Sequence, residues 1–185
     1  MIKKFKNLFD KIVLRAELYL ADPYEKINVY KKRLKFKAGK NIRVTGNIFF
    51  GSEPYLVTLG NDITITQNIA FHTHDGGVGI FRKEYPNINI FKRIKVGNNV
   101  FFGSNSAVMP GATIGDNVVI AANSVVTGNV ESNSVYGGVP ARKIKTLEEY
   151  KKSALKHAIF VDSKGEKRKQ EILNQLEELE RTNRL

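Results

Sequence analysis

A six-residue repeat between Val96 and Val130 is the feature that most limits how this chain can fold. In one-letter code its hexads are VGNNVF, FGSNSA, VMPGAT, IGDNVV and IAANSV, and the shorter VTGNV follows them. The first position of every hexad is aliphatic or Phe, the fifth is small or aliphatic, and Gly, Asn and Asp recur between them. A repeat of this length predicts a parallel β-helix, in which each coil packs only on its neighbours.

Each hexad has the residues for one short strand and one corner. The β-branched residues favour an extended backbone, whereas Gly, Asn and Asp tolerate the positive φ that a sharp corner needs. Three hexads make one triangular coil, which buries its aliphatic row against the coils on either side. An ordinary β-sandwich is the alternative, but its strands alternate with a period of two residues.

The repeat also exists upstream in a less regular form. Its hexads begin at Ala38, slip over residues 50–58 and then resume. At 185 residues the chain is expected to hold one domain with terminal appendages. We predict an all-β core over residues 38–145, preceded by a helical segment and linker at 1–37 and followed by helices at 146–185.

The repeat breaks at residues 71–75, and about twenty residues without it follow before Val96. A long excursion of this kind in a compact domain is usually functional. We therefore predict a protruding loop over residues 75–93. It begins beside His72 and His74, the two histidines of the repeat region.

The first twenty residues form an amphipathic pattern, with Ile2, Phe5, Leu8 and Ile12 at helical spacing and basic residues on the other face. Such a helix either packs on the end of the β-helix or contacts a membrane surface. Pro23 and the residues after it are expected to form a linker into the first coil.

The C-terminal segment has a helix start in which Thr146 is the N-cap and Glu149 completes a capping box. The helix is expected to continue to about Phe160. A turn at 162–165 and a last helix from about Glu166 complete the prediction.

The composition excludes several classes of function. Without cysteine, the chain has no disulfide framework and no thiol nucleophile. The formal charge of +12 indicates either a solvated basic surface or attraction of anions such as a phosphate-rich cofactor. No nucleic-acid motif is present, so nucleic acid is not an expected partner. The start lacks a secretory pattern, and a cytoplasmic location is expected, with peripheral contact to the inner membrane face left open.

Three segments carry a family resemblance: IKVGNNVFFGS at 94–104, PGATIGDN at 110–117 and SVYGGVPARKI at 134–144. Together they resemble the left-handed β-helix acyltransferases with hexapeptide repeats. Within that family the chain is most similar to the sugar O-acetyltransferases, which include maltose, galactoside, capsule and O-antigen acetyltransferases. The left hand of the coil is implied by this resemblance.

The resemblance implies a homotrimer with active sites between neighbouring subunits, acetyl-CoA as co-substrate and no required metal. The family's catalytic base is a histidine at the start of the protruding loop, and the segment Thr73 to Gly76 matches that place. His74 therefore takes the role of the base, with His72 as a secondary candidate. Imidazole, with an ordinary pKa of about 6.5, suits proton removal from a sugar hydroxyl during direct acetyl transfer.

The resemblance also implies binding residues. Those expected along the acetyl-CoA groove are Phe101, Ser104, Ala122, Thr127, Arg142 and Lys145. The last two match basic residues that meet the nucleotide end of the cofactor, whereas Phe101 replaces a tryptophan common in the family. Those expected near the acceptor are Asn47, Glu53, Asp75 and Arg82. Glu53 and Asp75 either orient His74 or hold the sugar.

Other functions stay open on the sequence alone. The acceptor is a sugar, a nucleotide-sugar or a lipid-linked glycan, and N-acetylation of an amino nucleotide-sugar or a xenobiotic is an alternative to O-acetylation. A zinc protein of the γ-carbonic anhydrase kind needs three histidines across an interface. This chain has His72, His74 and His157, the last outside the repeat. A non-catalytic binding β-helix would bind no acetyl-CoA.

Overall fold

The structure is a computed structural model that describes residues 2–182. It divides into one compact unit that ends at Lys145 and a second that begins at Thr146. Three residues of the predicted apolar face, Ile2, Phe5 and Leu8, have side chains that are not among those the structure describes.

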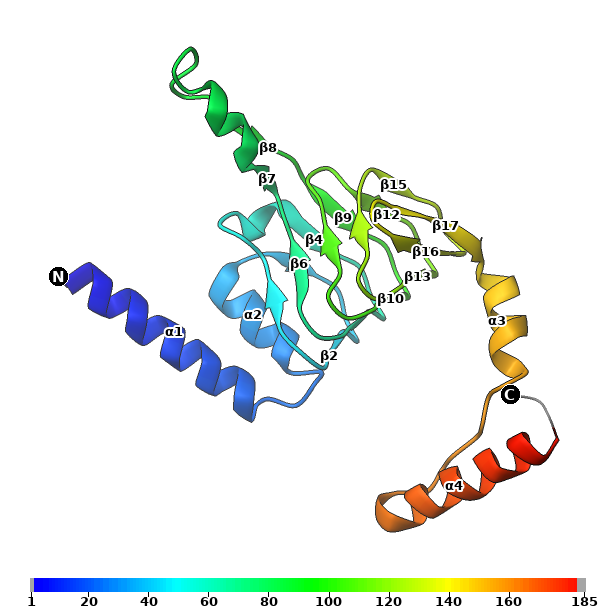
Figure 1. The fold of residues 1–185 in the computed structure, drawn as a ribbon. Helices are drawn as coiled ribbons and strands as arrows, with labels where there is room; N and C mark the ends of the chain where they lie inside the picture. Colours follow the sequence, from blue (N-terminus) through cyan, green and yellow to red (C-terminus); the bar gives the residue numbers. More distant parts are fainter. Residues whose placement is uncertain (1, 183–185) are drawn as a thin grey trace. The chain divides into compact units, whose positions relative to one another are not determined.

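The first unit is built on three sheets, which form the faces of the β-helix and in which the pairs among strands β1 to β16 are parallel (Figure 1). The first sheet contains β1 (Lys37–Ala38), β4 (Val57–Leu59), β9 (Ile94–Val96), β12 (Thr113–Ile114) and β15 (Asn129–Val130). The second contains β2 (Arg43–Val44), β5 (Thr64–Ile65), β10 (Val100–Phe102), β13 (Val118–Ile120), β16 (Ser134–Gly138) and β17 (Ala141–Thr146). The third contains β3 (Ile48–Phe49), β6 (Ile69–Phe71), β11 (Ala107–Val108) and β14 (Val125–Val126). These stacked sheets of short parallel strands confirm the predicted β-helix.

The number of residues per coil varies along the chain. Corner side chains Asn99 and Asn117, which are 18 residues apart, mark a coil of three hexads. Asn41 and Asp62 are 21 residues apart, so the first coil carries extra residues. These lie in the predicted slip, where the short 3-10 helix η1 (Pro54–Leu56) forms the corner. The last coil is shorter, since Asn117 meets Asn133 only 16 residues later.

Asn and Gly at the corners have separate structural roles. Asn99, Asn117 and Asn133 all have positive φ, between 52° and 58°, and their side chains form a ladder along one edge. Gly97 lies against the next coil, where an added Cβ would be 2.4 Å from Asp116 Oδ1 and 2.8 Å from the carbonyl of Gly115. These positions show why the corner residues recur in each hexad.

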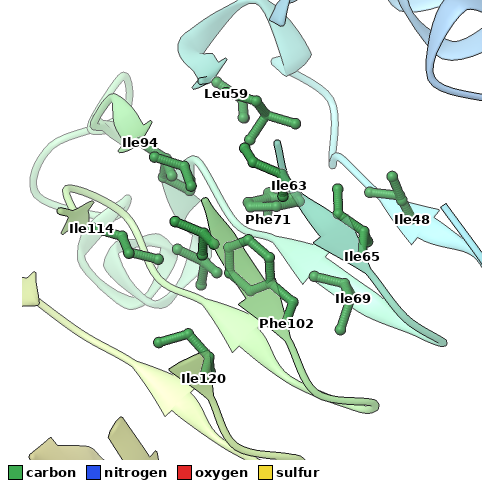
Figure 2. Packing of buried hydrophobic residues seen from close by; sticks show 14 of the residues in the cluster. Ile48, Leu59, Ile63, Ile65, Ile69, Phe71, Ile94, Phe102, Ile114 and Ile120 are labelled. Atoms are coloured by element: carbon green, nitrogen blue, oxygen red, sulfur yellow. The ribbon is translucent and has the colours of Figure 1, made fainter. Parts of the chain in front are cut away.

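The interior is filled by the first and fifth positions of each hexad, and Figure 2 shows Ile65, Phe102 and Ile120 for the first position. Phe102 pairs with Ile65 on one side and with Ile120 on the other, so equivalent residues stack from coil to coil. Its ring packs edge-on against Phe71, with ring centroids 5.7 Å apart. The aliphatic rows therefore form one continuous core along the axis.

The N-terminal segment contains two helices, α1 (Ile2–Leu20) and α2 (Lys26–Leu34). The prediction of a linker after Pro23 is wrong for Lys26–Leu34, because these residues form α2. The carboxylate of Asp22 accepts hydrogen bonds from the backbone N–H groups of Tyr24 and Glu25, at 2.7 and 3.1 Å, which stabilises the approach to this helix.

Helix α2 packs on the first coil of the β-helix. Ile27 and Tyr30 are buried there, and the Tyr30 hydroxyl accepts a hydrogen bond from the backbone N–H of Ile48 at 3.2 Å. An ion pair of 2.7 Å between Glu17 and Arg33 joins α1 to α2. These contacts favour the end-packing role of the segment. In the part of the chain that the structure describes, no helix has the length and apolarity needed to cross a membrane.

The second unit contains α3 (Leu147–Leu155) and α4 (Gly165–Arg181). The capping box is present: Thr146 Oγ1 accepts from the Glu149 backbone, and a Glu149 carboxylate oxygen accepts from the Thr146 backbone. Helix α3 ends earlier than predicted, and the turn expected at 162–165 is not formed. The Gln175 side chain bonds both backbone groups of Phe160, at 3.1 and 2.8 Å, in place of helical partners.

Candidate functional site

The candidate site lies where the chain leaves the β-helix between β6 and β9 (green in Figure 1). The excursion contains β7 (His74–Asp75), the 3-10 helix η2 (Gly76–Phe81) and β8 (Ile90–Phe91). Strands β7 and β8 pair antiparallel, with His74 opposite Phe91 and Asp75 opposite Ile90. We call the edge between the third and first sheets, at residues 50–56, 72–93, 109–112 and 127–128, the loop edge.

His74 is held by a carboxylate from the preceding coil. Its Nδ1 atom lies 2.8 Å from Glu53 Oε2. The buried Thr73 hydroxyl donates to the same oxygen at 3.3 Å. Glu53 comes from the extra residues of the first coil, so the slip in the repeat places the carboxylate beside the loop.

Glu53 is kept ionised by its surroundings. A hydrogen bond from the Ser52 side chain, together with those from His74 and Thr73, holds the pKa of Glu53 below its ordinary value, while burial opposes them. An ionised carboxylate only accepts hydrogen bonds, so Nδ1 of His74 carries the proton at this contact. The lone pair on Nε2 is then free to accept another proton.

A pocket of about 400 Å³ opens beside this pair. It is lined by His72, His74, Asp75, Gly76, Ile90, Lys92, Met109 and Pro110. The His74 side chain is 41% exposed and that of Glu53 is 15% exposed, so the imidazole faces solvent and the carboxylate stands behind it. This arrangement is suited to a histidine that removes a proton from a ligand in the pocket.

His72 and Asp75 line the same pocket but have other contacts. The His72 ring lies 5.8 Å from that of Phe49, centroid to centroid. Asp75 Oδ1 accepts a hydrogen bond from the Gly77 backbone at 2.8 Å, which caps η2. Asp75 therefore stabilises the start of the protruding loop.

Besides Glu53, which stands behind His74, two of the expected acceptor residues lie outside this pocket. Arg82 follows η2 and is exposed on the loop. Asn47 belongs to a ladder on another edge, where its amide donates to Asn68 at 3.4 Å. It lines a separate pocket of about 270 Å³ with α1 and α2. Within one chain, neither residue is brought to His74.

The expected cofactor residues are spread over the β-helix. Ser104 and Ala122 lie on the edge between the second and third sheets, which we call the Ser104 edge. Phe101 is exposed on the second sheet, and Thr127 lies on the loop edge. Arg142 and Lys145 lie on β17. The expected cofactor residues thus lie on two different edges of the β-helix and on two strands of its second sheet.

Four pocket residues were not singled out from the sequence: Ile90, Lys92, Met109 and Pro110. The positions of Met109 and Pro110 in the pocket could have been predicted from the repeat, because corners of successive coils stack on one edge. The backbone N–H of His72 donates to Val108 at 2.8 Å, which places that next corner directly beside the loop. Among the side chains that the structure describes, no three His, Asp or Glu residues gather to hold a metal ion.

The chain matches known proteins over the β-helix. A family described as bacterial transferase hexapeptide (six repeats) matches residues 93–128. Protein CapG of Staphylococcus aureus is 52% identical over 111 residues, which cover 60% of this chain and 64% of that protein. Galactoside O-acetyltransferase of Escherichia coli (strain K12) is 34% identical over 136 residues, covering 71% of this chain and 64% of that protein.

A solved galactoside acetyltransferase in complex with coenzyme A has the same fold, with a TM-score of 0.57 and 28% sequence identity. The superposition covers 88% of this chain and 88% of the other. By contrast, the matched region spans 64% of the length of both CapG and the Escherichia coli enzyme.

Proposed function

Since this chain belongs to the bacterial transferases with hexapeptide repeats, we propose that it transfers an acetyl group from acetyl-CoA to a sugar hydroxyl. The observation that carries this proposal is the 2.8 Å contact between His74 Nδ1 and Glu53 at the pocket. Galactoside O-acetyltransferase among the relatives supports a sugar acceptor. The family resemblance, which includes capsule and O-antigen acetyltransferases, favours a sugar destined for a polysaccharide.

The two site residues perform a direct transfer. Acetyl-CoA, when bound, supplies the acyl group as a thioester. Glu53 holds the Nδ1 proton of His74, so Nε2 removes the hydroxyl proton of the acceptor as its oxygen attacks the thioester carbonyl. The same nitrogen returns this proton to the departing thiolate, and no covalent acyl-enzyme is needed.

The residues expected to meet acetyl-CoA fit its chemistry. Arg142 and Lys145 form no ion pair with another described side chain, and both are cations suited to the phosphates of the nucleotide end. The exposed ring of Phe101 offers an apolar surface, and the small side chain of Ala122 leaves room beside the Ser104 edge.

Release of CoA tests this function directly. Thiol release from acetyl-CoA is measured with a panel of sugars, amino sugars and nucleotide-sugars, and the chain has no cysteine to add background. Acceptor-dependent release supports acetyl transfer, and dividing the panel distinguishes hydroxyl from amine acceptors. Absence of both release and acetyl-CoA binding contradicts the proposal and favours a binding β-helix.

The division of the proposed site between two edges of the β-helix supports the homotrimer that the family resemblance implies. We expect light scattering to give three times the 20.8 kDa mass of the chain. The loop edge of one subunit then faces the Ser104 edge of the next. The mass of a single chain under assay conditions would contradict an active site between subunits.

Glu53→Gln should lower kcat by about 10- to 100-fold, because the imidazole loses its anionic partner and its fixed orientation. The KM for acetyl-CoA should stay close to that of the unaltered protein. Glu131→Gln is a matched control, since Glu131 pairs with Lys143 at 2.7 Å away from the pocket. Equal kcat values for the two variants would remove Glu53 from the mechanism.

The same carboxylate predicts a change in stability with pH. Its folded-state pKa is lowered, so its contribution is fully present above the unfolded pKa, near 4.5, and is lost as the pH falls through the folded value. Thermal unfolding between pH 3 and 7 should therefore show a smaller acid-induced decrease in Tm for Glu53→Gln.

A further inference from the structure

Lys92 lines the His74 pocket and has no role in the mechanism described above. Its backbone N–H donates to the carbonyl of Thr73 at 2.8 Å. Thr73 directly precedes His74, so this bond ties the end of the protruding loop to its beginning. The position of Lys92 beside the imidazole is therefore determined by the backbone.

The aliphatic stem of Lys92 is supported by the next corner of the loop edge. Gly111 has a φ of +88°, and an added Cβ there would lie 3.0 Å from Lys92 Cδ. The absence of a side chain at Gly111 thus leaves room for the stem. Its methylene groups lie close to this corner of the loop edge.

The ammonium group of Lys92 has no ion-pair partner among the described side chains. Two carboxylates of the site have other hydrogen-bond partners. Glu53 accepts from His74 and Thr73, and an oxygen of Asp75 accepts from the Gly77 backbone. The pocket therefore presents a cation whose charge no neighbouring side chain pairs.

We propose that Lys92 selects an acceptor sugar that carries a negative charge, as a carboxylate or a phosphate. The ammonium pairs with this anion while a hydroxyl of the same sugar lies against Nε2 of His74. An unpaired cation in a concave site attracts anions and fixes their position. This inference rests on the proposed acetyl transfer and adds the chemical class of its acceptor.

Three probes with the same ring test the charge preference: galactose, galacturonate and galactose 1-phosphate. Binding is followed at low salt by NMR of the His74 ring, in the presence of CoA. The chain has three histidines, and His72→Ala and His157→Ala assign the other two signals. We expect at least one charged probe to half-saturate the shift at a concentration about fivefold lower than galactose.

Lys92→Met keeps most of the stem and removes the charge, so it should abolish this advantage, whereas Lys92→Arg should retain it. Lys95→Met is the matched control, because Lys95 is exposed on β9 outside the pocket and the loss of net charge is identical. Raising the salt concentration should weaken the binding of charged probes and leave that of galactose unchanged.

The outcomes separate this inference from the proposed function. Equal half-saturation by charged and neutral probes, no shift with either charged probe, or an advantage that survives in Lys92→Met overturns the role of Lys92. Acceptor-dependent CoA release without charge preference leaves the transfer standing and removes the inference. A charge preference without acetyl-CoA binding and without CoA release from any acceptor supports the anion-binding pocket and contradicts acetyl transfer.

Discussion

His74→Ala should reduce the rate of acceptor-dependent CoA release by about 10²- to 10⁴-fold, which is the usual contribution of a general base. In the variant no imidazole stands between the Glu53 carboxylate and the acceptor hydroxyl. The loss should appear in kcat, with little change in the KM for acetyl-CoA, because the expected cofactor residues lie on other strands and corners. Steady-state kinetics with the best acceptor of the panel measures both constants.

His72→Ala is the matched control for this substitution. His72 lines the same pocket, but its ring faces Phe49, whereas the Glu53 carboxylate holds His74. We expect a decrease of less than about tenfold in kcat, since His72 does not remove the proton. A normal rate in His74→Ala with a lost rate in His72→Ala would assign the base to His72. Survival of the rate in both variants would assign it to solvent.

Phe102→Ala should lower the free energy of unfolding by about 3–5 kcal/mol, the usual cost of truncating a fully buried aromatic side chain. The Phe102 side chain is completely buried and contacts Phe71 in the next coil. Its removal leaves a cavity in the middle of the stack, between the rows of Ile65 and Ile120. Urea unfolding followed by circular dichroism, at one fixed protein concentration, measures the loss.

Phe101→Ala gives a direct comparison on the same strand. Phe101 is 41% exposed on the outer face of β10, so its truncation should cost less than about 1 kcal/mol of stability. Its proposed contact with the cofactor predicts a higher KM for acetyl-CoA. Similar losses of stability in Phe101→Ala and Phe102→Ala would contradict the assignment of Phe102 to the interior and Phe101 to the outer face.

The β-helix was predictable because each hexad contains, within six residues, the pattern that specifies its own strand and corner. A buried aliphatic residue at every sixth position and a corner residue that tolerates positive φ define the coil without reference to distant parts of the chain. Asn99 and Asn117 show this directly, since both adopt the same backbone conformation one coil apart. The capping box of Thr146 and Glu149 was also predictable, because both of its hydrogen bonds lie within one helical turn.

Helix α2 was not predictable by the same reasoning. Lys26–Leu34 is only nine residues long, and four of them are basic. The helix is stabilised by burial of Ile27 and Tyr30 against the first coil, a surface that exists only after the β-helix has formed. Tertiary packing of this kind overrides a weak local pattern.

For the site, the break in the repeat pointed to His72 and His74 together, and the family resemblance selected His74 as the expected base. It left Glu53 with two possible roles, as a partner of His74 or as a sugar contact. The tertiary structure places Glu53 behind the imidazole, at 2.8 Å, and this contact favours the first role. It also brings Lys92 into the pocket, which no spacing in the sequence had indicated.

There is a physical reason why the sequence predicts the fold and the position of the loop but not the contacts between the site side chains. A period of six residues specifies which side chains point inward and where each coil turns, so the fold and the position of the loop follow from sequence alone. The neighbours of a side chain on the outside of a corner depend on how many residues each coil contains. Glu53 and His74 lie 21 residues apart, and they meet only because the extra residues of the first coil and the protruding loop leave the β-helix at the same edge.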